Sequence, residues 1–459
     1  MKRMLPLLMA LTFVLGVFSA YAADTPIQLR LAVPQDTPDR KAQREALFAK
    51  FARFEALNPG VKIVPVVFEY TDRQTFFLKQ AAHLAPDTFI VYATEGQMLA
   101  SKGWAAPLDE YIAGWDKKSW YNPDSFGPFS IGGHVYGVPD DNYINHIIYN
   151  KKMFKEKGIP EPTLNWTWDE FINDAVKLTD KSKGIAGYVH MTKGSEGGWA
   201  LTDFLYAAGG EVEVEKDGKT YAAFDSPEAI KAAQLLKDLR WKYDVLPSNW
   251  LNGWADAFNV FGAGKAAMVF DGGWGRNLAI NGQDMNPADI GVTLMPKGPG
   301  PKGRQAGVLG GSYWIINGLQ KDKAVRDAAW KFNTFEMWDD KALGDVQSQI
   351  ADARKNKLYR AFFSYRPLMP DAPYLAKEKA LLDANKDVAI QWGTPEFLKA
   401  LPGTAHPEPP VAAQDAYGKY LSPLVQKIMA DKNADPAALM KETAARFQKE
   451  VLDPINAAQ

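Results

Sequence analysis

The 459-residue chain contains no cysteine. It therefore has no disulfide bond, no thiolate nucleophile and no cysteine to which a lipid anchor could be attached. Its five histidines show no spacing of the His-x-x-x-His kind, which zinc enzymes use to hold their metal. We therefore expect a protein that needs no metal ion and no cofactor.

Other features that the sequence lacks narrow its function further. The formal net charge is only −1 at pH 7, so electrostatics give no reason to expect nucleic acid or an anionic membrane as a partner. The Gly-x-Ser-x-Gly nucleophile motif and the Walker phosphate loop are both missing. Asp140 and Asp141 resemble the acid pair of a glycoside hydrolase, but adjacent strand residues point to opposite faces. We therefore expect a binding protein with no catalytic residues, and glycoside hydrolysis is the weaker alternative.

The N-terminus has the pattern of an export signal. Lys2 and Arg3 precede an apolar run from Met4 to Phe18, and Ala20-Tyr21-Ala22 has the small-x-small pattern that signal peptidase cleaves. The run is short for a membrane span, although a retained anchor is the alternative. We expect residues 1–22 to be removed and the remainder to work in a Gram-negative periplasm, where an outer membrane retains a chain without a lipid anchor.

Strand and helix patterns alternate in the first part of the chain. Apolar and polar residues alternate over 27–33, and similar short runs follow at 61–68 and 88–92. Helical spacing of apolar residues lies between them, at 46–57 and 73–83. This βαβαβ order predicts a mainly parallel sheet flanked by helices.

The rest of the chain repeats this mixture. Thr167 and Glu170 can form a capping box for a helix over 168–178, and Ser226-Pro227 can start another that runs to about 243. A second α/β block begins near 184–189. Two further strands, 291–294 and 313–316, are joined by a surface loop rich in proline and glycine, and the chain closes with an amphipathic helix over 435–448.

Six motifs in this order resemble those of the extracellular solute-binding proteins of family 1, the sugar-type binding subunits of ABC importers. Each motif alone is a weak signal, but together they span about 27–340 behind an export signal. They are Ala85-Pro86-Asp87, Gly103–Asp109, Gly133–Lys152, Trp168–Phe171, Phe261–Met268 with Gly273-Trp274, and Gly310–Ile316.

The resemblance implies an α/β protein of the type II periplasmic kind, with two lobes joined by crossing hinge strands. We expect the N-terminal lobe to comprise 23–140 and 305–345, and the C-terminal lobe 141–304 and 346–459. Ligand would be trapped between the lobes, and a membrane permease would recognise the closed form. We expect a monomer whose partners are a carbohydrate and the permease subunits of an ABC transporter.

Sugars need two kinds of contact. Their C–H faces stack on aromatic rings, and their hydroxyls bond to polar groups, charged ones above all. The resemblance places sugar-stacking aromatics at Trp274 and Trp199, and Trp254 is a third candidate. Packing is the alternative for all three.

Polar candidates gather where the two lobes would cross. At the first crossing lie Asp140, Asp141, Asn142 and Tyr143, and at the second Gly311, Ser312 and Tyr313. Glu95 follows the strand 88–92, at the carboxyl end where open α/β sheets place ligands. Arg354 and Arg366 could each donate two parallel hydrogen bonds, with surface ion pairs as the alternative.

The sequence thus predicts a periplasmic protein that captures a carbohydrate, with a di- or oligosaccharide favoured, and delivers it to an ABC permease. A glycerol phosphate or other polyol as ligand is an alternative, as is service to a periplasmic sensor.

Overall fold

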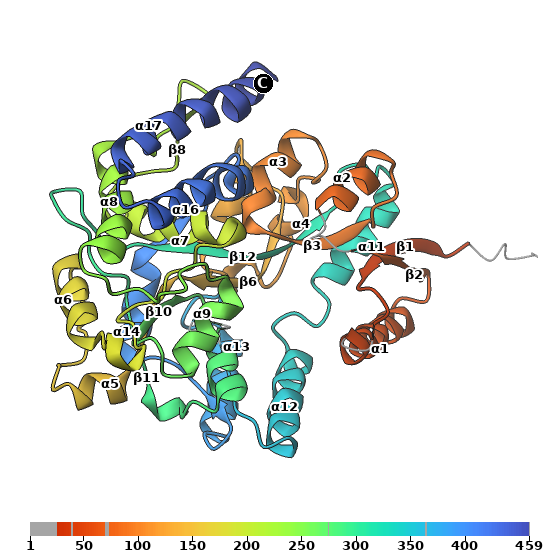
Figure 1. Cartoon of the computed structure of the whole chain (residues 1–459). Helices are drawn as coiled ribbons and strands as arrows, with labels where there is room; N and C mark the ends of the chain where they lie inside the picture. Colours follow the sequence, from red (N-terminus) through yellow and green to blue (C-terminus); the bar gives the residue numbers. More distant parts are fainter. Residues whose placement is uncertain (1–24, 38–39, 69–72, 274, 363–364, 459) are drawn as a thin grey trace, which may run out of the picture.

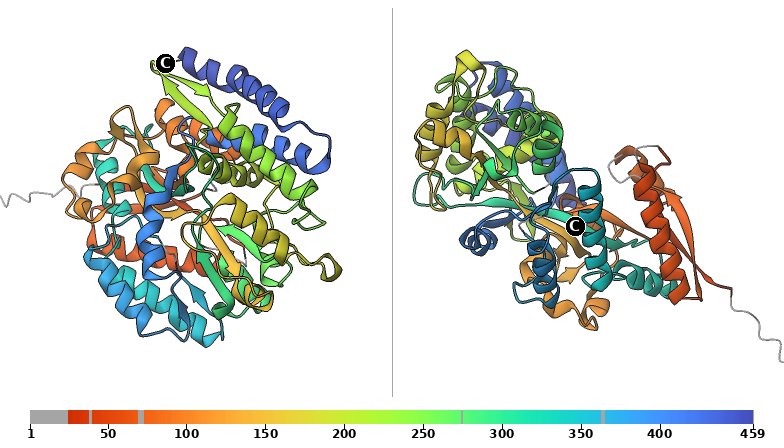
Figure 2. Two further views of the ribbon diagram at one scale, coloured as in Figure 1. Left: turned by 90° about the vertical axis from the view of Figure 1, so that its left-hand side faces the viewer. Right: turned by 90° about the horizontal axis from the view of Figure 1, so that it is seen from below.

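The computed structural model describes residues 25–37, 40–68, 73–273, 275–362 and 365–458. A search of these residues for a helix with the length and hydropathy of a membrane span finds none. The chain forms two α/β lobes, which Figures 1 and 2 show side by side. This confirms the predicted fold class.

The first lobe is built on a mainly parallel sheet. Strands β1 (Ile27–Val33) and β2 (Val61–Val67) pair in parallel, and β3 (Thr88–Tyr92) lies on the other side of β1, also parallel. Helices α1 (Lys41–Leu57) and α2 (Arg73–Ala81) connect them, so the βαβαβ prediction is confirmed. The sheet order is β15 (Ala405–Pro407), β12 (Gly307–Ile316), β3, β1 and β2, which puts β3 next to a strand from much later in the chain.

Two long strands cross between the lobes. Strand β6 (Val138–Ile144) pairs antiparallel with β12 (Gly307–Ile316), and both run through the middle of Figure 1. We call β6 and β12 the crossing strands. Strand β12 was predicted only over 313–316, because Gly310 and Gly311 carry no side chain to continue an apolar pattern. A third segment crosses near β15 (Ala405–Pro407), which pairs with the start of β12.

The second lobe is built on a three-stranded sheet. Strand β7 (His146–Asn150) continues β6 and lies between β10 (Met268–Asp271) and β11 (Ile290–Thr293). Both pairings are antiparallel, which differs from the mainly parallel sheet predicted for each lobe. The reason is that β7 enters from the first lobe rather than after a helix. Around 184–189 the chain makes an isolated parallel bridge, Ala186 to Ala266, instead of a regular strand.

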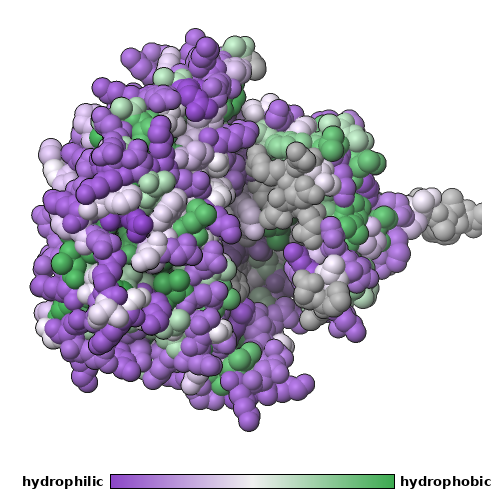
Figure 3. All heavy atoms as spheres, in the orientation of Figure 1, coloured by the Kyte–Doolittle hydropathy of each residue, from purple (hydrophilic) through white to green (hydrophobic). Residues whose placement is uncertain are grey.

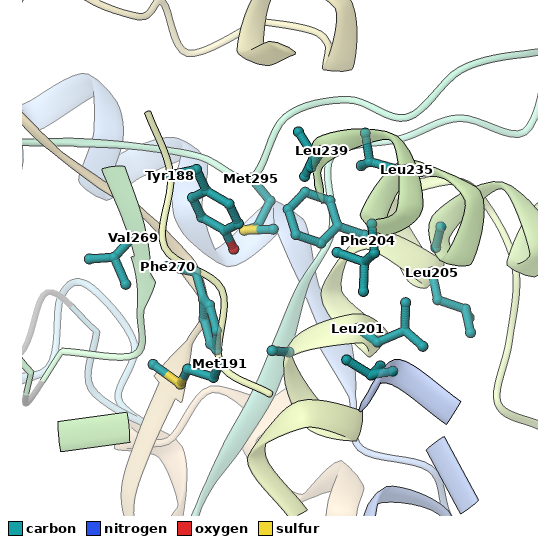
Figure 4. Packing of buried hydrophobic residues seen from close by; sticks show 14 of the residues in the cluster. Tyr188, Met191, Leu201, Phe204, Leu205, Leu235, Leu239, Val269, Phe270 and Met295 are labelled. Carbon is teal, nitrogen blue, oxygen red and sulfur yellow. The ribbon is translucent and has the colours of Figure 1, made fainter. Parts of the chain in front are cut away.

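Helices cover this second sheet and form the larger core. Helix α6 (Trp168–Leu178) begins with the predicted capping box, in which Glu170 accepts a hydrogen bond of 2.7 Å from the Thr167 backbone N–H. Helix α8 (Pro227–Trp241) has Ser226 as its N-cap and Pro227 at its first position, as predicted. The other helices of this core are α7 (Gly194–Ala207), α9 (Trp254–Gly262), α16 (Ser422–Ala430) and α17 (Pro436–Phe447). Figure 4 shows part of this core, where side chains of α7 (Leu201, Phe204, Leu205) and α8 (Leu235, Leu239) pack with Val269 and Phe270 of β10.

The segment after α11 (Lys323–Asn333) packs on both lobes. Leu368 and Tyr374 share a buried cluster with Leu29 and Phe54 of the first lobe, although the predicted division put them in the C-terminal lobe. The segment contains α12 (Asp340–Lys355) and α13 (Pro373–Asp383). The remaining elements are α3 (Gly96–Ser101), α4 (Asp109–Ala113), β4 (Ser130–Ile131), β5 (His134–Val135), α5 (Lys151–Glu156), β8 (Glu213–Lys216), β9 (Lys219–Ala222), α10 (Gly275–Asn277), β13 (Arg360–Ala361), β14 (Ala389–Ile390), α14 (Pro395–Ala400), α15 (Ala413–Asp415) and α18 (Asp453–Ala458).

Candidate ligand-binding site

One face of the sheet at the crossing strands carries polar groups. In the strand register, Ser312 of β12 lies beside Asp141 of β6 on one side and beside Tyr92 of β3 on the other. Paired residues of neighbouring strands point to the same face, so these three side chains lie together. Tyr92 ends β3 and is 48% exposed, which makes this face accessible at the carboxyl end of a parallel strand.

The opposite face of the crossing strands is structural. Asn142 and Tyr313 are buried, and the Asn142 amide donates to Gly310 O at 3.0 Å and to the Tyr313 hydroxyl at 2.9 Å. Tyr313 in turn donates to Ser125 O at 2.8 Å. The structure therefore separates these two candidates from Asp141 and Ser312, because alternate strand residues point to opposite faces.

Asp140 occupies a β-bulge between the two faces. The register of the crossing strands shifts here, and Trp314 Nε1 donates to Asp140 Oδ1 at 3.0 Å. Burial raises the pKa of Asp140, while the positive charges of Lys50 and Arg366 oppose that rise. Asp140 thus lies next to Trp314, on the side of the first lobe.

Aromatic side chains of the second lobe border the crossing. The ring of Trp199 on α7 packs edge to face on the rings of Tyr143 and Phe270, with centroid separations of 6.0 Å and 5.0 Å. Its indole Nε1 is shielded from solvent and has no hydrogen-bond partner among the described residues. A buried N–H without a partner costs free energy, so a ligand acceptor at this position would gain from it. Trp199 and Tyr143 are the two predicted aromatic residues that the structure brings into contact at the crossing strands.

The segment that follows β10 lies against the same tyrosine. A Cβ on Gly272 would come within 2.9 Å of the Tyr143 ring, so this close contact requires glycine. Asp271 fixes the turn, because its carboxylate accepts from Gly273 N at 2.8 Å and from Gly275 N at 3.2 Å. Trp274, the sugar-stacking residue that the resemblance implies, lies outside the described residues.

Trp254 is held near the start of α7. Its backbone N–H donates to Glu196 Oε2 at 2.6 Å, and its half-buried ring meets Phe258 edge to face at 5.1 Å. Burial raises the pKa of Glu196, and the bond from Trp254 opposes that rise. Trp254 and Trp199 therefore both depend on α7 for their position.

Three further candidates have different surroundings. Glu95 is 2% exposed and lies inside the turn after β3 rather than on the open face. Gly311 contributes backbone only, in a conformation with φ of +146°. Arg354 forms an exposed ion pair with Asp387 at 2.9 Å, so the structure does not bring it to the crossing strands.

A cavity of about 800 Å³ adjoins the exposed face, between α1, the ends of β1 and β3, and α12. Tyr92, Trp314 and Lys50 line it, and none of the three was a sequence candidate. Alternation from Ser312 along β12 could have identified Trp314, whereas Tyr92 and Lys50 become visible only in the folded chain. Figure 3 shows the surface hollowed between the lobes.

The site contains polar oxygens, nitrogens and aromatic faces but no metal-binding cluster. Within the described ranges, no group of three or more His, Asp or Glu is placed to hold a metal ion. Chemically, the site can accept hydrogen bonds through Asp140 and Asp141, donate through the Trp199 indole, and pack on apolar ring faces.

Comparisons with known proteins agree with this geometry. The chain is 28% identical over 212 residues to the multiple sugar-binding protein of Streptococcus mutans, covering 44% of this chain and 47% of that one. It is 27% identical over 299 residues to the sn-glycerol-3-phosphate-binding periplasmic protein of Escherichia coli, covering 62% and 65%. A solute-binding protein of a Thermotoga lettingae ABC transporter, solved with α-D-tagatose, superposes with a TM-score of 0.68 at 22% identity, covering 92% of this chain and 99% of that one.

The family comparison covers most of the first lobe, both crossing strands and much of the second lobe. The model that describes the bacterial extracellular solute-binding proteins matches residues 36–335, which is more than half of the chain. With the two lobes and the crossing strands, this match shows that the chain belongs to the bacterial extracellular solute-binding protein family.

Proposed function

We propose that this protein captures a carbohydrate between its lobes in the periplasm and delivers it to the permease of an ABC transporter, without changing it chemically. The observation that carries the proposal is the Trp199 indole N–H, which has no partner in the described part of the chain and lies beside Tyr143 at the crossing. Family membership and the relatives named for sugars support it.

The two kinds of group at the site match the two surfaces of a sugar. The rings of Trp199 and Tyr143 offer apolar contact to C–H faces, and Trp274 stays a predicted third ring. Asp141 and Ser312 offer oxygens to hydroxyls in the ring plane. We infer that ligand bridges the lobes and thereby favours the closed state, which the permease recognises.

A glycerol phosphate is the second candidate ligand. It is favoured by the relative from E. coli and by the positive charges of Lys50 and Arg366, which act on Asp140. Against it, Asp140 and Asp141 are adjacent carboxylates at the crossing, and they repel an anion unless cations outweigh them. We therefore favour a neutral carbohydrate.

Isothermal titration calorimetry of the purified protein tests this choice. Maltose, D-tagatose and longer maltodextrins are compared with sn-glycerol 3-phosphate, and an amino acid and a short peptide serve as controls. We expect heat with at least one neutral sugar and none with the controls. Binding of a peptide or amino acid alone would sink the carbohydrate proposal, and release of reducing ends from a glycan would indicate a hydrolase instead.

A further inference from the structure

Helix α7 presents two different faces to its surroundings. Leu201, Phe204 and Leu205 point into the core of the second lobe, as Figure 4 shows. Trp199 and Asp203 are four residues apart and therefore lie one above the other on the helix surface. Trp199 contacts Tyr143 of β6, and Asp203 reaches the same pair of crossing strands.

The carboxylate of Asp203 closes a ring of hydrogen bonds with both crossing strands. Its Oδ1 accepts from the backbone N–H of Val308 in β12 at 2.8 Å, and its Oδ2 accepts from the side-chain amide of Asn145, just after β6, at 2.9 Å. The backbone N–H of Asn145 donates to the backbone oxygen of Val308 at 3.0 Å. The three residues thus join α7, β6 and β12 at one point.

This ring is fully enclosed by protein. Asp203 and Asn145 are both 0% exposed. Burying a carboxylate is costly, and an apolar residue of similar size would avoid that cost if packing were the only requirement. The bonds that Asp203 makes are directional, so they fix the rotation of α7 relative to the crossing strands as well as its distance from them.

The ring also contacts the turn that follows β10. A Cβ on Gly272 would lie 3.2 Å from Asn145 Oδ1 and 2.9 Å from the Tyr143 ring, so the turn after β10 packs directly on Asn145. A displacement of Asn145 would therefore move the turn that precedes Trp274. Through α7 Asp203 is connected to Trp199, and through Asn145 it is connected to the turn at Gly272 that packs on Tyr143.

We propose that Asp203 is a positioning residue of the ligand site: it ties α7 to the crossing strands and so sets where the Trp199 ring lies against Tyr143. The proposal rests on the proposed function, because it gives Trp199 a role in binding ligand. Asp203 itself is buried behind Trp199 and Tyr143 and does not contact the ligand.

The first test observes Trp199 in the ligand-free protein. Tryptophan is replaced by 5-fluorotryptophan, and the ¹⁹F resonance of residue 199 is assigned by its loss in Trp199→Phe. In Asp203→Leu, which removes both acceptors and keeps the number and branching of the side-chain heavy atoms, we expect the Trp199 resonance to shift and broaden. A Trp199 resonance that coincides with that of the wild type would overturn the proposal.

Asp87 supplies a matched control. It is 3% exposed, and its carboxylate accepts from a backbone N–H, Arg30, at 2.7 Å and from a side-chain amide, Gln320, at 2.9 Å. It precedes β3, at the opposite end of that strand from Tyr92. Asp87→Leu should lower the free energy of unfolding, because it also removes two buried hydrogen bonds, and should leave the Trp199 resonance in place. If both variants moved that resonance equally, the effect would be general loosening, and the proposal would fail.

A second variant covers the case in which Asp203→Leu does not fold. Asp203→Asn keeps the shape and one acceptor for Val308, but its amide meets the Asn145 amide donor to donor unless Asn145 turns over. Either response changes the contacts of Asn145, so we expect the Trp199 resonance to shift in the same direction by less. An unchanged resonance in a folded Asp203→Asn protein would also contradict the proposal.

The two proposals fail in different ways. The ¹⁹F experiment uses no ligand, so the absence of heat with every sugar would remove the proposed function and leave the positioning role of Asp203 standing. Conversely, sugar binding with normal affinity in Asp203→Leu would leave the function standing and remove the positioning role. In the expected case, Asp203→Leu weakens sugar binding at least about tenfold, the loss that a misplaced aromatic contact and its hydrogen bond produce.

Discussion

At the scale of single residues, Trp199 has a well-packed ring but a hydrogen-bond donor without an acceptor among the described residues. The ring of Trp199 packs on Tyr143 and Phe270, yet its N–H has no acceptor among the described residues. Packing alone needs an apolar ring and no N–H donor. The position of that N–H at the crossing is therefore the residue-scale reason to expect a ligand there.

Replacing Trp199 by alanine should weaken sugar binding at least about tenfold, because both the ring contact and the indole donor are lost. Titration calorimetry measures the change. Trp330, a partly buried tryptophan that stacks on Tyr111 at 5.3 Å in the first lobe, supplies the control. Trp330→Ala should lose stability and retain affinity. Equal affinity in Trp199→Ala and the wild type would remove Trp199 from the site. Trp274→Ala is predicted to behave like Trp199→Ala.

Asp141→Asn separates the two ligand classes. Asp141 lies beside Ser312 on the exposed face, and the substitution removes one negative charge with little change of shape. A neutral sugar should bind less tightly, because charge-assisted hydrogen bonds to hydroxyls become neutral ones. The affinity for sn-glycerol 3-phosphate should rise, because the repulsion of its phosphate falls. Tighter binding of the neutral sugar would contradict the role given to Asp141.

At the scale of elements, regular patterns were predictable and exceptions were not. The alternation over 27–33 and the apolar run over 88–92 predicted β1 and β3 with the observed bounds, and Thr167 with Glu170 predicted the start of α6. The glycine-rich half of β12 could not be recognised, because its pairing depends on close contact with β6. Because the pairing of β12 with β6 was not recognised, Asn142 and Tyr313 were predicted to bind ligand although they lie on the buried face. They stood in a polar stretch at the crossing, but the face each side chain takes depends on the register and on the bulge at Asp140.

Gly311 should be the most sensitive position of this strand pair. Its φ of +146° disfavours other residues, and an added Cβ would lie 2.1 Å from Asp141 O. Gly311→Ala should lower the free energy of unfolding by more than about 2 kcal/mol, measured by urea denaturation. Gly60→Ala is the comparison, since a Cβ there meets nothing within 4 Å. If the two substitutions cost the same, the close contact of β6 with β12 would not limit residue 311.

At the scale of the whole molecule, buried acids hold the two crossing strands and the third segment near β15. Asp203 holds β12 and the end of β6. Glu213, on β8, accepts from Val411 N at 2.8 Å and Ala412 N at 3.0 Å in the third crossing segment. Glu408 of that segment accepts from the Tyr417 hydroxyl. These contacts could not be predicted from the sequence, because the acids are far apart in the chain and none stands in a recognisable motif.

These acids should make the folded protein less stable as the pH rises from 6.5 to 8. Burial raises the pKa of Asp203 and Glu213 to about 7 and that of Glu408 to about 8. In the unfolded chain all three are already deprotonated in this window, so the folded state binds more protons and loses stability with rising pH. His146 and His190, whose pKa values burial lowers to about 4 and about 3, oppose this trend at the acid end of the window, because near pH 6.5 each is about half protonated in the unfolded chain and neutral in the folded one; the three acids bind more protons there and outweigh them.

Urea denaturation at half-unit steps of pH between 6.5 and 8 measures this slope. Glu213→Gln removes one of the three titrating groups and keeps a carbonyl acceptor in the same place, so the variant should lose stability less steeply than the wild type. Glu215→Gln, a change in the exposed part of the same strand β8, should leave the slope as it is. A wild-type stability that is constant or rises over this window would show that the acids at the lobe connections are ionised in the folded protein.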